Sequence, residues 1–318
     1  SLDVVASGSG IAVAGSGTVT LNALATARDI SIGATVSART GTIQLNAART
    51  IGTAADIRAT GAGDIELAAG SSIAQAGGIR SAGGTITVRA HAGSISMGDT
   101  ALASTRGTGA ILYSAQTDVA LGLVEAEAAV TVTAATGAIT DNTAGEGPNV
   151  AGAAVVLSAA TSIGAPGMGD VGTRVNSLTA TAQDGSVHLR ESDGLTLTAV
   201  TAAGTDNDVT VASDSGDITV VAVTAPDLVS LNAATGAIVD GNATGADITA
   251  TRAALRAARG IGSRNPLEIS VSTLAGSNTA SGSIRIANSV GGLLTIGTVD
   301  GVAGISNARA GALGARIA

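Results

Sequence analysis

The chain has 318 residues, including 45 glycines, and its 24 acidic and 16 basic residues give a net charge of −8. It contains no Phe, Trp, Cys or Lys and only one Tyr. These features exclude a globular core built on aromatic side chains, a collagen repeat, a disulfide framework and a thiolate metal site, while plentiful Val, Ile and Leu argue against disorder.

A short strand pattern recurs along the chain. Each copy alternates apolar with polar residues and often ends in Ala, as expected for a half-buried strand that reaches a corner. Successive copies begin 19 to 32 residues apart. The copies are Val19–Ala23, Ile43–Ala47, Ile65–Ala69, Ile86–Ala90, Ile111–Ala115, Val130–Ala134, Val155–Ala159, Val187–Leu189, Val209–Val211, Val229–Ala233, Ala253–Ala257 and Ile284–Ile286.

A second strand follows each copy at a similar distance, and a third strand follows most copies. The second begins at Ile30, Ile51, Ile73, Ile95, Val119, Ile139, Ile163, Leu195, Ile218, Ile238, Ile261 and Leu293. The third is seen at Ile57–Ala59, Ile79–Ser81, Val124–Ala126, Val200–Ala202, Val223–Ala225, Ile248–Ala250 and Ile269–Val271. Three short strands in each repeat are typical of one coil of a triangular solenoid.

The sequence therefore predicts an all-β, right-handed parallel β-helix (β-solenoid) of about 12–13 triangular coils, each of roughly 19–32 residues. Slim β-branched residues suit a stacked interior, and Gly suits the corners, where φ can be positive. We expect residues 1–318 to form a single continuous solenoid. The lack of an initiator Met and of a signal peptide suggests a fragment of a longer repeat protein or a processed chain.

Two local features need an interpretation within this fold. The segment Thr251–Arg259 has high helix propensity, but its only large apolar residue is Leu255, so an amphipathic helix would have little to bury. We therefore favour a strand there. Tyr113 stands where other copies have an inward Leu or Val, which indicates a core aromatic residue rather than a functional site.

The coils differ mainly in the connection after the second strand. Long connections follow Ile139, Ile163, Ile238 and Ile261, and insertions in one phase would emerge along one edge, which in repeat proteins is often a binding face. The competing interpretation is that long corners are simply tolerated. The candidate contact residues are Asp141, Asn142, Glu146, Asn149, Met168, Asp170, Asp240, Asn242, Arg264 and Asn265.

The C-terminal part of the chain contains five segments of a distinctive kind: Leu231–Gly241, Gly260–Gly262, Asn265–Glu268, Ser281–Ile284 and Leu294–Gly301. They resemble the repeats of giant secreted bacterial exoproteins and adhesins of the filamentous haemagglutinin type. The resemblance is densest from about Val229 to Asn307. It implies a β-helix exported across the outer membrane and displayed on the cell surface or released, with its secretion domain outside this chain.

Little in the sequence supports catalysis. There is no Lys for a phosphate-binding loop or a Schiff base, and no Gly-x-Ser-x-Gly elbow. His91 and His188 are far apart and are interpreted as surface residues. A carbohydrate-active β-helix enzyme is the alternative, but it would lack aromatic platforms for sugar rings. We expect no catalytic or cofactor-binding residue.

Acidic residues are concentrated between Asp184 and Asp247. Oxygen-rich loops can hold Ca²⁺, so this region could form a calcium-binding surface-layer module, although no known calcium motif is present. A solvated acidic face is the competing interpretation. The calcium candidates are Asp206, Asp208, Asp214 and Asp217.

These observations together predict a structural or adhesive module, a stiff stalk with loops for weak contacts. We expect homotypic end-to-end or lateral association and contact with a host surface, a neighbouring cell or a polysaccharide. The acidic charge disfavours nucleic acid as a partner. No apolar run is long enough for a membrane helix, so we expect no direct membrane insertion.

Overall fold

The computed structural model describes residues 1–5, 10–308 and 313–317. These residues form an all-β parallel solenoid of about 13 turns of roughly 22 residues, without a helix. Accordingly, the described part of the chain has no helix that could cross a membrane. The chain divides into two compact units, unit 1 (Ser1–Ala160) and unit 2 (Thr161–Ala318).

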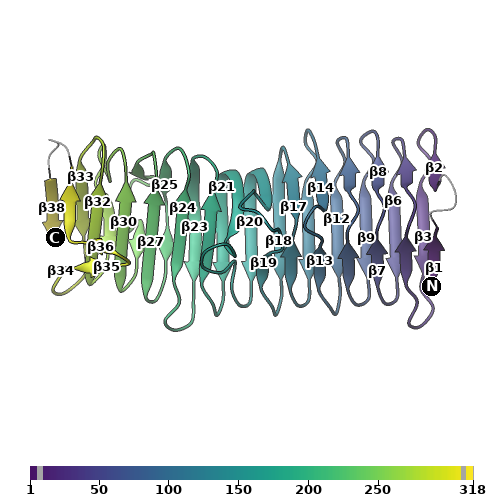
Figure 1. Cartoon of the computed structure of the whole chain (residues 1–318), viewed down its shortest axis with the longest axis horizontal. Coiled ribbons are helices and arrows are strands. Elements are labelled where there is room, and N and C mark those ends of the chain that lie inside the picture. The colour runs from purple at the N-terminus through teal and green to yellow at the C-terminus, as the bar shows by residue number, and fades with distance from the viewer. Residues whose placement is uncertain (6–9, 309–312, 318) are drawn as a thin grey trace. The chain divides into compact units, whose positions relative to one another are not determined.

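Unit 1 has three sides, each a parallel sheet in which a strand pairs with the equivalent strand one turn later (Figure 1). Side 1 contains β3 (Val19–Ala23), β6 (Ile43–Ala47), β9 (Ile65–Ala69), β12 (Ile86–Ala90), β15 (Ile111–Ala115), β18 (Ala129–Ala134) and the end of β20 (Val150–Ala159). Side 2 contains β1 (Leu2–Val4), β4 (Ile30–Ile32), β7 (Ile51–Thr53), β10 (Ile73–Gln75), β13 (Ile95–Met97), β16 (Val119–Leu121) and β19 (Ile139–Asp141). Side 3 contains β2 (Ile11–Val13), β5 (Val36–Ala38), β8 (Ile57–Ala59), β11 (Ile79–Ser81), β14 (Leu102–Thr105), β17 (Leu123–Ala126) and the start of β20.

The register places like residues directly on one another. Ile43 pairs with Ile65, Ile65 with Ile86, and Ile86 with Ile111, and all four side chains have no exposed surface. Burial of such a side chain contributes about 1.5–3 kcal/mol. Identical branched side chains at the same height pack without gaps, so this narrow core needs no aromatic residues to fill it.

Unit 2 also has three sides, which are numbered within this unit (Figure 1). Side 1 contains β22 (Val187–Glu191), β24 (Val209–Ser213), β27 (Leu228–Ala233), β30 (Arg252–Ala257), β32 (Thr273–Asn278), β34 (Thr295–Ile296) and β37 (Ile305–Asn307). Side 2 contains the start of β23 (Leu195–Ala202), β25 (Ile218–Val220), β28 (Ile238–Asp240), the start of β31 (Leu267–Ser270), β33 (Ile284–Asn288) and β38 (Leu313–Ile317). Side 3 contains the end of β23, β26 (Val223–Thr224), β29 (Ile248–Thr249) and the end of β31. The long strand β21 (Val171–Ala182) pairs in turn with β22 and with both parts of β23.

The predicted phase is wrong at two places in unit 2. Ile163, predicted on the second strand, pairs with Val187 of side 1, which follows it by about one turn. Ile284, predicted on the first strand, pairs with Ile261 on side 2, while β32 occupies side 1. The 31-residue step before Ile284 contains a whole turn plus one side. Consequently Leu293, predicted to point inward, is 85% exposed.

Two local predictions are confirmed. Arg252–Ala257 forms strand β30, with Leu255 fully buried, so packing in the stack overrides the helix propensity of this segment. Tyr113 is 1% exposed, and its hydroxyl donates a hydrogen bond to Oε1 of Gln75 at 2.5 Å. Burial raises the pKa of the Tyr113 hydroxyl, which is therefore neutral at physiological pH.

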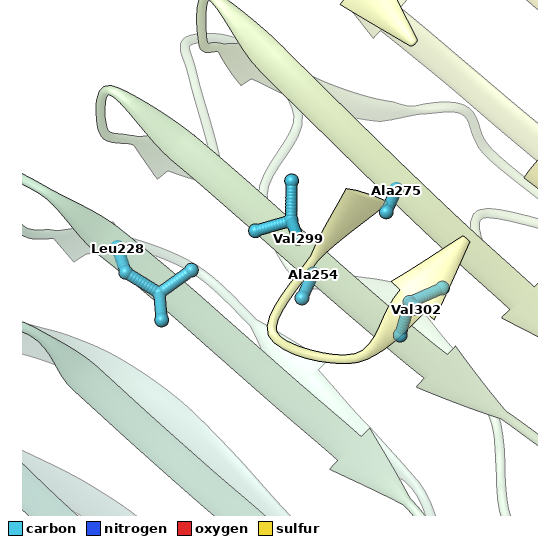
Figure 2. Packing of buried hydrophobic residues seen from close by; sticks show 5 residues of the cluster. All are labelled: Leu228, Ala254, Ala275, Val299 and Val302. Atoms are coloured by element: carbon cyan, nitrogen blue, oxygen red, sulfur yellow. The ribbon is translucent and has the colours of Figure 1, made fainter. Parts of the chain in front are cut away.

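A small hairpin covers the outer face of side 1 in unit 2. Strands β35 (Thr298–Val299) and β36 (Val302–Ala303) are antiparallel. Figure 2 shows Val299 and Val302 over the outward side chains Leu228, Ala254 and Ala275, and all five residues are buried. Within the turn, Asp300 Oδ2 accepts hydrogen bonds from Arg256 at 3.0 Å and from Ser230 at 2.8 Å. Side 1 is therefore buried on both faces here, which period-2 alternation does not predict.

Candidate functional site

The structure gives the four calcium candidates other positions and contacts. Asp206 is an exposed turn residue with a φ of 58°. Asp214 pairs with the Arg190 guanidinium at 3.1 Å. The carboxylates of Asp208 and Asp217 accept backbone N–H groups of the following coil, from Leu228 at 3.1 Å and from Ala237 at 2.8 Å. Asp208 and Asp217 thus each form a hydrogen bond to the next coil, and the four carboxylates do not line a shared cavity.

The contact made by Asp208 and Asp217 recurs in both units. In each case an Asp stands directly before the first apolar residue of a strand, and its carboxylate accepts the N–H of the equivalent residue one turn later. The N···O distances are 2.8–3.1 Å. The further pairs are Asp29 with Thr50, Asp56 with Gly78, Asp64 with Thr85, Asp118 with Ala138 and Asp247 with Glu268.

In unit 1, the predicted contact loop after β19 is closed by its own side chains. Asn149 is buried and donates a hydrogen bond from Nδ2 to Asp141 Oδ1 at 2.6 Å, so it holds the loop from within rather than facing a partner. Asn142 Nδ2 donates to the backbone oxygen of Met97 at 2.5 Å. Glu146 lies at the exposed tip.

In unit 2, the loop of residues 164–170 interrupts side 1, because Ile163 pairs with Val187 and Val171 pairs with Leu189. Gly164 has a φ of 69°, and a Cβ there would lie 2.3 Å from the backbone oxygen of His188. Met168 is 70% exposed at the tip, and Asp170 is partly buried. This loop therefore lies on a different side of unit 2 from the loops after Ile238 and Ile261.

The loop of residues 241–247 follows side 2, the loop of residues 262–266 interrupts side 2 one coil later, and hydrogen bonds join the two. Asn265 Nδ2 donates a hydrogen bond to Asp240 Oδ2, and the backbone N–H of Glu268 donates to Asp247 Oδ2 at 2.8 Å. Asn242 Nδ2 donates to Asp247 Oδ1 at 2.7 Å. The predicted contact residues Asp240, Asn242 and Asn265 therefore lie together, and we call this surface the loop edge of unit 2 (residues 240–247 and 262–268).

The loop edge contains the one group of three or more acidic or imidazole side chains that the described residues bring within metal-ligand distance. Carboxylate oxygens of Asp240, Asp247 and Glu268 lie within 4.8 Å of one another and could hold a divalent cation. Asp247 and Glu268 were not predicted as site residues. The signal for Asp247 is its position directly before Ile248, which the capping aspartates share.

Asp247 is buried, and burial together with the nearby carboxylates of Asp240 and Glu268 raises its pKa to about 8. Near neutral pH its proton therefore offsets the repulsion between these acids. The corresponding position in unit 1 is Asn149, also directly before a strand and bonded to an Asp of its own loop. Unit 1 thus has a neutral amide where unit 2 has a titratable acid.

A pocket of about 370 Å³ lies beside the loop edge, on the outer face of side 2. It is lined by Asp217, Thr219, Ala237, Val239, Arg259, Ser263 and Arg264. Both arginines are exposed, and within the described part of the chain neither guanidinium forms a hydrogen bond or an ion pair. Of its lining residues, only Arg264 was predicted as a contact residue, because the pocket depends on how three coils stack.

A second buried acid was missed. Glu191 has no exposed surface and accepts hydrogen bonds from the Thr173 hydroxyl at 2.8 Å and from the backbone N–H of Asp193 at 3.2 Å. Burial raises its pKa to about 7. Glu191 stands at the end of a side 1 strand, where the paired positions of other coils hold Thr173, Ser213, Ala233, Ala257 and Asn278, and this variable position gives no sequence signal for a buried acid.

Fold and site together define the chain as a parallel β-solenoid with a polar loop edge. In comparisons with known proteins, it matches no family model, no curated protein and no solved structure.

Proposed function

We propose that the chain is a non-catalytic structural and adhesive module of an exported bacterial surface or extracellular fibre protein. The coils supply a stiff support, and the loop edge of unit 2 supplies weak contacts to a polysaccharide, a host cell or a neighbouring cell. The resemblance of residues 229–307 to repeats of secreted adhesins supports export to the cell surface.

One observation carries the proposal. Two insertions on successive coils, residues 241–247 and 262–266, are joined by the Asn265–Asp240 and Glu268–Asp247 hydrogen bonds. These bonds hold the two loops together as one polar surface supported by the rigid coils, an arrangement typical of binding loops. Asp208 and Asp217 cap the next coil and Asp214 pairs with Arg190, so all three carboxylates contribute to the structural module that we propose.

The test separates adhesion from catalysis. The purified chain is incubated with a panel of acidic and neutral polysaccharides, with and without Ca²⁺, and both the bound fraction and newly formed reducing ends are measured. We expect binding to at least one polymer without cleavage. Reproducible cleavage that is abolished in Asp214→Asn and Asp217→Asn variants would favour a carbohydrate-active enzyme and contradict the proposal.

A further inference from the structure

The pocket beside the loop edge brings together two unpaired cations in an acidic chain. Arg259 stands at the corner before Ile261, and Arg264 belongs to the loop that follows this residue. Three other arginines of unit 2 pair with carboxylates: Arg190 with Asp214, Arg252 with Asp227, and Arg256 with Asp300. Among the described residues Arg285 is exposed and unpaired as well, but it does not line this pocket. The pocket is therefore distinguished by bringing two unpaired guanidinium groups into one hollow.

The pocket also contains acceptor groups. The carboxylate of Asp217 is held at the wall, because it accepts the Ala237 N–H at 2.8 Å. The hydroxyls of Thr219 and Ser263 line the same space. A guanidinium fork matches a carboxylate, and an Asp carboxylate accepts hydroxyl groups but repels a bare anion. The lining thus favours a ligand that carries one carboxylate together with several hydroxyl groups.

We infer that this pocket binds a hexuronate unit of an acidic polysaccharide, with Arg259 and Arg264 holding the carboxylate and Asp217 accepting ring hydroxyls. The inference rests on the proposed adhesive function and names its ligand class. A volume of about 370 Å³ lies within the range of small-molecule sites and accommodates a sugar ring. No Phe or Trp is present to stack on that ring, so ion pairing and hydrogen bonds supply the affinity.

Such a site has a defined salt dependence. Both guanidiniums are exposed, so added salt screens their attraction for a carboxylate. A single hexuronate therefore binds weakly, and higher affinity requires a polymer that engages several copies of the chain at once.

The test uses the full chain and trigalacturonate, with binding followed by chemical-shift changes or calorimetry. The test variant is Arg259→Ala/Arg264→Ala, and the control is Arg89→Ala, which removes an exposed arginine of unit 1. We expect at least tenfold weaker binding by the double variant and no change in the control. Fully methyl-esterified trigalacturonate should bind at least tenfold more weakly than the free acid.

Three results would overturn the inference: unchanged affinity in a double variant with native circular dichroism, equal binding of the methyl ester, or inorganic phosphate binding as tightly as trigalacturonate. Failure of the hexuronate inference can be distinguished from failure of the proposed adhesive function. If the double variant binds trigalacturonate as tightly as wild type while chain-coated beads still attach to cells, the pocket assignment is overturned and adhesion stands. If wild-type beads fail to attach, adhesion is overturned, whereas trigalacturonate binding still reports directly on the pocket.

Discussion

Asp217 shows how single residues connect the coils. It stands directly before Ile218, and its carboxylate accepts the N–H of Ala237, which stands directly before Ile238 one turn later. The first N–H of the strand, that of Ile238, donates to Gly260 in the next coil, whereas the N–H of the preceding residue Ala237 lies at the corner and takes its acceptor from the Asp of the preceding coil. This contact explains why acids occur before strands in a chain whose charge might otherwise suggest metal binding.

The first prediction concerns this cap. Asp217→Ala removes the acceptor of the Ala237 N–H and should lower the free energy of unfolding by about 0.5–1.5 kcal/mol. Asp214→Ala is the matched control, because its exposed pair with Arg190 should contribute less than about 0.5 kcal/mol. Chemical denaturation of both variants measures the difference. Equal losses would show that the inter-coil hydrogen bond adds nothing beyond a surface charge.

The second prediction concerns pH. The folded chain keeps the Glu191 proton up to about pH 7, whereas the unfolded chain loses it near the ordinary pKa of 4.5. The free energy of unfolding should therefore fall as the pH rises through this interval, by about 1–3 kcal/mol from this residue. Glu191→Gln cannot lose a proton, so the variant should gain stability relative to wild type as the pH rises from 4.5 to 7. A difference that stays constant with pH would contradict the assignment.

At the scale of the elements, two loops of unit 2 interrupt strands, and in each case the paired strand of the next coil is uninterrupted. Ile163 and Val171 flank one loop and pair with Val187 and Leu189, which are separated by a single residue. Ile261 and Leu267 flank the other and pair with Ile284 and Ile286, again separated by a single residue. Each loop is thus an insertion into a strand whose register is already set by the next coil.

This arrangement makes the third prediction. Replacing residues 164–170 with a single serine should restore an unbroken strand, leave the circular dichroism unchanged and alter the free energy of unfolding by less than about 1 kcal/mol, because loop length has a small entropic effect. Thermal and chemical denaturation measure this. Loss of the folded state would show that the loop is required for the stack.

At the scale of the whole chain, the parallel β-solenoid and nearly all of unit 1 follow from sequence, because Ile, Leu and Val recur at the spacing of a coil and stack in register. The predicted assignment of strands to sides was wrong at Ile163 and Ile284, because an apolar-x-apolar strand has the same sequence pattern on every side. The hairpin over Leu228 and the cluster around Asp247 also escaped prediction. Both depend on contacts between coils that local spacing does not encode.

The most direct test of the account measures cell attachment under flow to surfaces coated with three chains. These are wild type, the variant with residues 164–170 replaced by serine, and the variant with residues 262–266 replaced by serine, which removes Arg264 and Asn265 from the loop edge while Ile261 and Leu267 keep their pairing. We predict that wild type and the first variant retain cells and that the second variant releases them. Equal retention by all three folded chains, or none by wild type, would contradict an adhesive loop edge.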